Sequence, residues 1–407
     1  CNSSQNVTVT VNPTPQLSSS LAPPSICSAT TFAYTPTSAV AGATFAWTRA
    51  AVAGISQAAG SGTGNISETL TNTTAAPIVV TYAIVTTANS CPGPSQNVVV
   101  TVNPFPTLSS SLTPPSICSA TTFNYTPTSA TPGATFAWSR ALVVGISQIA
   151  SSGTGSISET LTNTTTAPVV VTYSITTTAN TCVGVPQSVT VTVNPIPSLS
   201  STLTPAAICS ATTFAYTPTS AVAGATFAWT RALVAGISQA ASSGAGAISE
   251  TLSNTTTAPV VVTYAFTTTA NGCSAPQNVT VTVNPIPVLS SSLTPPAICS
   301  ATTFNYIATS ATAGATFAWT RAAVAGISQA AASGTGSVSE TLTNTTTAPV
   351  VVTYSYTTTA NGCSNTPQNV TVTVNPIPAL SSTLTPAAIC SGSTFTYTAT
   401  SATAGAT

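Results

Sequence analysis

The stretch Ala-Thr-Phe-Ala-Trp-Ser-Arg at residues 134–140 decides the fold of this chain, and it recurs almost unchanged at 43–49, 225–231 and 315–321. Its Phe, Trp and Arg occupy alternate positions, with Thr, Ala and Ser between them. Because side chains of a strand point alternately to its two faces, this pattern predicts a half-buried β-strand rather than a helix. Residues 121–127, Thr-Thr-Phe-Asn-Tyr-Thr-Pro, alternate in the same way and place their aromatic residues on the face of the tryptophan. Two such strands with an aromatic centre are typical of a two-sheet sandwich.

The whole sequence repeats with a period of 90–91 residues, which recurrent Asn-Pro dipeptides mark. About ninety residues are enough for one small β domain with its own core. We therefore expect an all-β chain, a tandem array of β-sandwich domains. Because the first residue falls within a repeat and no Met occurs, we also expect the chain to be part of a longer protein. The expected segments are the last strand of a preceding repeat at 1–12, complete repeats at 13–103, 104–194, 195–284 and 285–375, and a partial repeat at 376–407.

In the second repeat, alternating apolar and polar residues predict three further strands, over 156–163, 169–178 and 188–194. A short edge strand is expected over 108–112. The segment 141–153 fits a short helix or an irregular strand, and its β surroundings favour the strand. Several short strands in ninety residues predict a Greek-key sandwich.

Composition excludes several classes of function. The only charged residues are four Arg and four Glu, and Lys, Asp and His are absent. Because general acid–base catalysis, metal binding and phosphate neutralisation draw on the missing residue types or on clusters of charge, we expect no enzyme, no cofactor, no metal site and no nucleic-acid partner. No run approaches the roughly 18 apolar residues that a membrane helix requires, so we do not expect a membrane-embedded protein.

Four sequence motifs of the second repeat recur along the whole chain, at 117–123 (Ile-Cys-Ser-Ala-Thr-Thr-Phe), 134–138 (Ala-Thr-Phe-Ala-Trp), 178–182 (Thr-Ala-Asn-Thr-Cys) and 189–195 (Val-Thr-Val-Thr-Val-Asn-Pro). Together they resemble the PKD-like and immunoglobulin-like repeats of very large secreted surface proteins of gliding and biofilm-forming Bacteroidetes. The resemblance implies an immunoglobulin-like fold, export by the type IX pathway to the cell surface, and service as an adhesin or filament stalk. The chain departs from many PKD domains in one respect, because Ser-Arg-Ala follows the tryptophan in place of the acidic Trp-Asp-Phe-Gly-Asp-Gly motif.

Ten cysteines, two per repeat, alternate at spacings of 64 and of 26 or 27 residues, which is typical of a disulfide framework. With the strands placed as above, Cys118 lies at one pole of its sandwich and Cys182 at the other. Strand lengths then separate the two by some tens of ångströms, whereas a disulfide needs Cα atoms within roughly 7 Å. We therefore expect bonds across the junctions between repeats, while bonds within a repeat in another topology, bonds between chains and free thiols remain open alternatives. The expected pairs are Cys27–Cys182, Cys118–Cys273 and Cys209–Cys363, and the cysteines expected to pair outside this chain are Cys1, Cys91, Cys299 and Cys390.

Each repeat carries one Arg, two residues after the tryptophan, and one Glu between two aliphatic residues of a later strand. Both have inward parity, and in an immunoglobulin-like sandwich their strands lie in opposite sheets. The two charges are either solvated at an edge or paired between the sheets, and the cost of burying an unpaired charge favours the pair. The expected ion pairs are Arg49–Glu68, Arg140–Glu159, Arg231–Glu250 and Arg321–Glu340, and the tryptophans expected in the cores are Trp47, Trp138, Trp229 and Trp319.

The outward positions are mostly Thr, Ser and Asn, so the surface carries almost no charge that would keep molecules apart. We expect a non-catalytic extracellular structural protein, the stalk or filament of a large cell-surface adhesin, stiffened by disulfides. Its expected partners are neighbouring repeats of the same chain and further copies packed side by side into fibres. The alternative is a repetitive binding array that holds glycans or external surfaces, or less plausibly ice, through Thr-rich faces. Asn-x-Ser/Thr tripeptides, as at Asn163, are expected by chance in so Thr-rich a chain.

Overall fold

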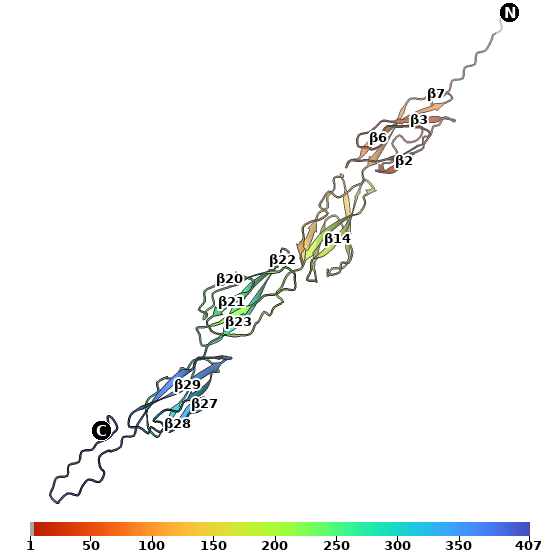
Figure 1. Ribbon diagram of the computed structural model, residues 1–407. Coiled ribbons are helices and arrows are strands. Elements are labelled where there is room, and N and C mark those ends of the chain that lie inside the picture. Colours follow the sequence, from red (N-terminus) through yellow and green to blue (C-terminus); the bar gives the residue numbers. More distant parts are fainter. Residues whose placement is uncertain (1–3) are drawn as a thin grey trace. The chain divides into compact units, whose positions relative to one another are not determined.

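The computed structural model describes residues 4–407, and throughout this range the regular secondary structure is β. The chain forms two compact units, with the boundary between Ile196 and Pro197. Each unit holds two complete repeats (Figure 1). All four repeats have the same strand order, so the second repeat can be described for all of them.

The second repeat is a sandwich of two β-sheets. One sheet has the strand order β12-β11-β14-β16-β9, with β15 paired to β14, and the other consists of β10 and β13. Neighbouring strands are antiparallel except β9, which runs parallel to β16. This is the arrangement of an immunoglobulin-like sandwich. The strands are β9 (Ile117–Cys118), β10 (Thr121–Tyr125), β11 (Thr135–Arg140), β12 (Ser151–Thr154), β13 (Ile157–Leu161), β14 (Val169–Ala179), β15 (Cys182–Val183) and β16 (Gln187–Asn194).

The other three repeats have the corresponding strands. In the first repeat they are β1 (Ile26–Cys27), β2 (Thr30–Tyr34), β3 (Thr44–Arg49), β4 (Gly60–Thr63), β5 (Ile66–Leu70), β6 (Ile78–Ala88), β7 (Cys91–Pro92) and β8 (Gln96–Asn103). In the third they are β17 (Ile208–Cys209), β18 (Thr212–Tyr216), β19 (Thr226–Arg231), β20 (Ser242–Ala245), β21 (Ile248–Leu252), β22 (Val260–Ala270) and β23 (Cys273–Asn284). In the fourth they are β24 (Ile298–Cys299), β25 (Thr302–Tyr306), β26 (Thr316–Arg321), β27 (Ala332–Thr335), β28 (Val338–Leu342), β29 (Val350–Ala360), β30 (Cys363–Ser364) and β31 (Gln368–Asn375).

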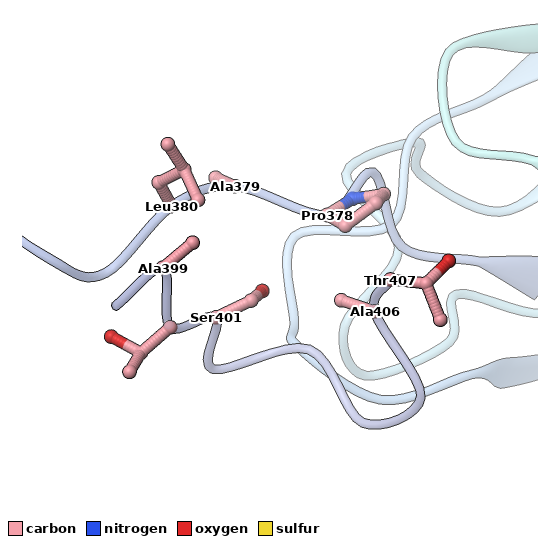
Figure 2. A pocket seen from close by; sticks show the side chains of 8 residues that line it. Pro378, Ala379, Leu380, Ala399, Ser401, Ala406 and Thr407 are labelled. Atoms are coloured by element: carbon pink, nitrogen blue, oxygen red, sulfur yellow. The ribbon is translucent and has the colours of Figure 1, made fainter. Parts of the chain in front are cut away.

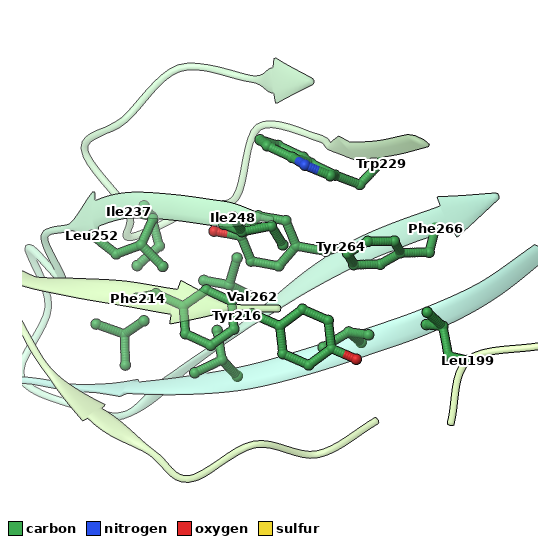
Figure 3. Close-up of a cluster of buried hydrophobic side chains, with 13 residues drawn as sticks. Leu199, Phe214, Tyr216, Trp229, Ile237, Ile248, Leu252, Val262, Tyr264 and Phe266 are labelled. Carbon is green, nitrogen blue, oxygen red and sulfur yellow. The ribbon is translucent and has the colours of Figure 1, made fainter. Parts of the chain in front are cut away.

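The core of each repeat lies between its two sheets, as the alternation of residues predicts. In the third repeat, the ring of Tyr264 on β22 stacks on Phe214 at 5.4 Å and meets the edge of Trp229 at 5.6 Å (Figure 3). Trp47 and Trp229 are buried, Trp138 and Trp319 are slightly more exposed, and all four pack against their cores. The tryptophans thus lie where the sequence places them.

Each tryptophan covers a glycine of the neighbouring strand. Trp138 on β11 is paired with Gly153 on β12, and a Cβ atom at Gly153 would lie 2.7 Å from the indole. Strand β12 begins at Ser151, within the ambiguous segment 141–153, and ends at Thr154. Residues 141–150 form neither helix nor strand.

Two expected strands are absent. The segment 108–112 forms no strand because it changes partners: Ser109 N–H donates to Thr128 beyond β10, whereas the carbonyl of Leu112 accepts from Thr190 on β16. Residues 4–12, the described part of the segment expected as the last strand of a preceding repeat, also form no strand. A strand needs a partner for its backbone groups, and 4–12 have none among the described residues. Residues 376–407 hold only one isolated bridge, between Leu380 and Ser401.

Within residues 4–407 there is no helix long and apolar enough to cross a membrane.

Candidate functional site

The first candidate site is the junction between the two repeats of the first unit. Cys27 is the last residue of β1, at the pole where β8 leaves the repeat, and Cys182 begins β15 just after the turn that follows β14. The two cysteines form a disulfide with a Cα–Cα distance of 5.6 Å. Beside it, the side-chain amide of Asn103, the last residue of β8, donates to the carbonyl of Asn180 at 3.3 Å. The bond therefore joins one repeat to the next, as the pole argument predicts.

The second unit repeats this junction. Cys209 at the end of β17 forms a disulfide with Cys363 at the start of β30, again with a Cα–Cα distance of 5.6 Å. Asn284 donates to the carbonyl of Asn361 at 3.0 Å. The same disulfide and the same Asn hydrogen bond occur in both units, so the junction has one recurring structure.

The remaining cysteines fall into three groups. The predicted Cys118–Cys273 bond would span the boundary between the two units and stays a prediction. Among the described residues, Cys91, Cys299 and Cys390 have no disulfide partner. Cys1 lies outside the described residues, and partners for these four cysteines elsewhere also stay a prediction.

The junction cysteine follows a tight hairpin turn in each repeat. Between β14 and β15 the turn residues Asn180 and Thr181 both have positive φ, at 50° and 67°. A two-residue turn of this kind matches the twist of the flanking strands, and it suits Asn-Gly best. The fourth repeat has Asn361-Gly362 at this place, with φ of 51° and 76°. The turn places the cysteine at the pole of the sandwich.

The second candidate site is the ion pair inside each sandwich. Arg49 on β3 donates from Nε to Glu68 Oε2 at 2.8 Å and from Nη2 to Oε1 at 3.2 Å. Since β3 and β5 belong to different sheets, the pair connects the two layers. The Arg side chain is 1% exposed and the Glu side chain 20% exposed. The corresponding pairs in the other repeats are Arg140–Glu159, Arg231–Glu250 and Arg321–Glu340.

Further groups complete the hydrogen bonding of this ion pair. Arg49 also donates to the carbonyls of Ala50 at 3.2 Å and Ala58 at 2.6 Å. The hydroxyl of Tyr82, a fully buried residue of β6, donates to Glu68 at 2.6 Å. This tyrosine is not recognisable as a partner from the sequence alone; the signal that identifies it is its position opposite Arg49 in the register of β3 and β6. A buried charge with this many partners does not incur the cost of an unpaired one.

The pKa values follow from this arrangement. Burial acts to raise the pKa of Glu68, but the hydrogen bonds from Arg49 and Tyr82 outweigh it, so the pKa lies below the ordinary value. The hydrogen bond to Glu68 raises the pKa of Arg49. Burial, together with the hydrogen bond to a carboxylate, raises the pKa of Tyr82 far above its ordinary value. These shifts favour the charged forms of Arg49 and Glu68 and the protonated form of Tyr82, which suits a structural role better than proton transfer.

Comparison with protein families identifies the repeats. A family model described as a PKD-like domain matches residues 24–106, 115–197, 206–287 and 296–378. The chain belongs to the PKD-like domain family. No curated protein matches it.

Several solved structures resemble the array of PKD-like repeats at low identity. A three-domain fragment of the titin I-band is 11% identical, with 67% of this chain and 98% of that chain covered and a TM-score of 0.35. The insect immune protein hemolin is 10% identical, with 90% and 100% covered and a TM-score of 0.25. Extracellular domains 3–5 of Drosophila OTK are 12% identical, with 65% and 94% covered and a TM-score of 0.26.

An asparagine fixes one pole of every PKD-like repeat. In the second repeat the side-chain amide of Asn163 donates to the carbonyls of Ala167 and Val193, both at 2.8 Å, and its oxygen accepts from Thr165. The backbone N–H of Asn163 donates to Ser119 at 2.9 Å. This residue stands in one of the Asn-x-Thr tripeptides, but it is 8% exposed and both its amide hydrogens are engaged. The folded repeat therefore does not offer Asn163 for glycosylation.

A surface hollow of about 340 Å³ lies in the segment 376–407 (Figure 2). Its walls include Leu380, Ala399, Ser401 and Ala406, and no titratable side chain. Leu380 corresponds to Leu289, which is buried in the core of the fourth repeat. We assign the hollow no ligand.

Proposed function

We propose that this chain belongs to a non-catalytic extracellular structural protein, in which PKD-like repeats form the stalk or filament of a cell-surface adhesin. The observation that carries the proposal is the disulfide that joins one repeat to the next, Cys27–Cys182 in the first unit and Cys209–Cys363 in the second. A bond within a repeat would stabilise that repeat alone. A disulfide across a junction limits bending between neighbouring repeats, and a stalk that holds its outer end away from the cell surface benefits from this stiffness.

The extracellular location rests on the same bonds, because disulfides persist in oxidising compartments and are rare in the cytosol. The resemblance to surface proteins of Bacteroidetes supports the finer proposal of export by the type IX pathway. A lack of catalysis is supported by the composition and by the fact that all eight charged side chains are paired inside the sandwiches.

Lateral association into fibres is the proposed partner interaction. With the charged side chains paired between the sheets, the outer surface consists mostly of Thr, Ser, Asn and Ala, and little repulsion opposes contact between copies. Sedimentation of the purified chain over a range of concentrations tests this, and a monomer at every concentration argues against it.

The stalk function is tested in cells that carry the whole protein. Deletion of two repeats, residues 104–284, should shorten the distance by which the protein projects from the cell surface, measured by immunogold electron microscopy with labels at its outer end. Adhesion per molecule at the outer end should persist. Loss of adhesion at unchanged projection would instead favour the binding-array alternative, as would a glycan-array or thermal-hysteresis signal from one isolated repeat.

A further inference from the structure

The junction disulfides change the covalent route by which tension passes along the chain. Cys27–Cys182 closes a loop that contains residues 28–181, and Cys209–Cys363 closes a loop that contains residues 210–362. Between the two loops, only the segment from Cys182 to Cys209 remains in the direct path. We infer that tensile load passes through the disulfides and bypasses the residues inside the two loops. The disulfides then limit the length to which the chain can be stretched. This inference deepens the proposed stalk function and rests on it.

The limit on extension follows from chain length. From Cys27 to Cys363 there are 336 residue steps, which reach about 1,100–1,200 Å when fully extended at roughly 3.3–3.6 Å per residue. Along the disulfide path there are 27 residue steps, about 90–97 Å, and two bonds of 5.6 Å between Cα atoms. The bonded chain is therefore about elevenfold less extensible between these residues. A bond between Cys118 and Cys273 would leave this path unchanged.

The sheet topology shows what the bond protects. Strands β1 and β8 lie side by side and parallel, and they are paired only through Ile26–Val102 and Cys27–Asn103. Without the disulfide, load enters the repeat ahead of β1 and leaves it after β8, so the two strands are pulled in opposite directions and these few backbone hydrogen bonds are sheared. With the disulfide, load on β1 passes from Cys27 directly to Cys182 of the next repeat. The short parallel pairing then bears none of it.

Single-molecule force spectroscopy of the oxidised chain 1–407, pulled by tags at its two ends, tests the inference. The oxidised chain should release no more than about 100 Å between Cys27 and Cys363. After reduction of the folded chain, steps of about 300 Å should appear, one for each repeat of about 91 residues. The double variant Cys27→Ser/Cys182→Ser should show at least one such step without reductant, and the control Cys390→Ser, whose thiol has no partner here, should behave as the unaltered chain.

Steps of about 300 Å in the oxidised, unaltered chain would overturn the inference, since the load would then cross the repeats. The same force traces for the reduced and oxidised chains would overturn it too. Capped extension together with an unchanged projection after repeat deletion in cells would contradict the stalk function but leave the force path in place. The two ideas can therefore fail separately.

Discussion

Replacing Glu159 by Gln tests the buried ion pair most directly, because Gln keeps the shape of the side chain and removes only its charge. Glu159 accepts hydrogen bonds from Arg140 Nε at 2.9 Å, from Arg140 Nη2 at 3.3 Å and from the Tyr173 hydroxyl at 2.5 Å. In the variant one of these donors faces an amide NH2, and the Arg charge stays buried with a side chain only 1% exposed.

The expected cost follows from what Arg140 retains. Removal of one partner of a buried pair costs about 3–5 kcal/mol. Arg140 keeps its bonds to the carbonyls of Ala141 and Ile149, and the Glu159 side chain is 15% exposed, so water reaches that end of the cluster. We therefore expect the lower limit, about 3 kcal/mol, which is roughly a hundredfold in the unfolding equilibrium constant of the second repeat.

Hydrogen exchange of the native chain, read by mass spectrometry, measures this change repeat by repeat. Backbone amides of β13 should exchange roughly a hundredfold faster in Glu159→Gln, while those of β21 in the third repeat, where Glu250 is unaltered, serve as an internal reference. The matched control is Thr160→Ala, an exposed neighbour on β13 that loses only a side-chain hydrogen bond to Thr122. It should change stability by less than about 0.5 kcal/mol.

Two results would refute this reasoning. One is an amide exchange rate at β13 of Glu159→Gln that lies within about threefold of the rate in the unaltered chain. Water would then stabilise the Arg140 charge as well as Glu159 does. The other is a double variant, Arg140→Met with Glu159→Leu, that loses as much stability as Glu159→Gln alone. Because the double variant buries no unpaired charge, it should recover most of the loss.

Three further predictions concern the second and third repeats. Gly244→Ala places a Cβ atom 2.7 Å from the indole of Trp229 and should cost about 1–3 kcal/mol, with a change in tryptophan fluorescence; an unchanged midpoint of denaturant unfolding would contradict the contact. In the second repeat, by comparison, Thr181→Gly relieves a β-branched residue at positive φ and should raise stability by about 1 kcal/mol, seen as a higher midpoint. The folded-state pKa of Tyr264 is raised, so its contribution to the free energy of unfolding is complete below the ordinary value of 10.0 and falls as the pH rises beyond it. The folded-state pKa of Glu250 is lowered, so its contribution to the free energy of unfolding is complete above the ordinary value of 4.5 and is lost as the pH falls below it. A pH series of denaturant midpoints should therefore show a plateau between these values, and Tyr264→Phe should flatten its alkaline side.

Most of the strands could be predicted from the sequence because their residues alternate. Strand β16 alternates buried Val with Thr, and β11 alternates Trp and Arg with small residues, so a period of two is easy to recognise. Strands β9, β12 and β15 escaped prediction for physical reasons, and β15, like β9, has only two residues. Strand β9 has two residues, too few to show a period, and β12 has a glycine where an apolar side chain would mark the inner face, because the indole of Trp138 occupies that space.

The candidate sites were predictable to different degrees. Disulfide connectivity cannot usually be read from a sequence. Here it could be worked out for Cys27–Cys182 because the strand order puts the two cysteines of one repeat at opposite poles, which leaves a neighbouring repeat as the partner within reach. The Arg–Glu pair followed from the inward parity of its two residues, from the opposite sheets of their strands and from the cost of an unpaired buried charge. The role of Tyr173 did not, because a buried tyrosine on an alternating strand looks like any other core aromatic until the register of β11 and β14 is known.

The chain separates the forces that hold a repeat together from those that hold repeats to each other. Inside each sandwich, the ion pair and the tyrosine respond to pH, and a change such as Glu159→Gln weakens one repeat without touching a junction. At the junction inside each unit, a disulfide and an Asn side chain respond to neither pH nor charge in the ordinary range, and a reductant is the agent that opens the covalent link. A stalk needs this separation, since a repeat that unfolds is then still joined to its neighbour by the disulfide between them. Acid below about pH 4.5 should therefore loosen the sandwiches while the covalent path from Cys27 to Cys363 remains intact, because the pKa of each Glu is lowered from its ordinary value of 4.5. A reductant at neutral pH should release that path while the sandwiches remain folded.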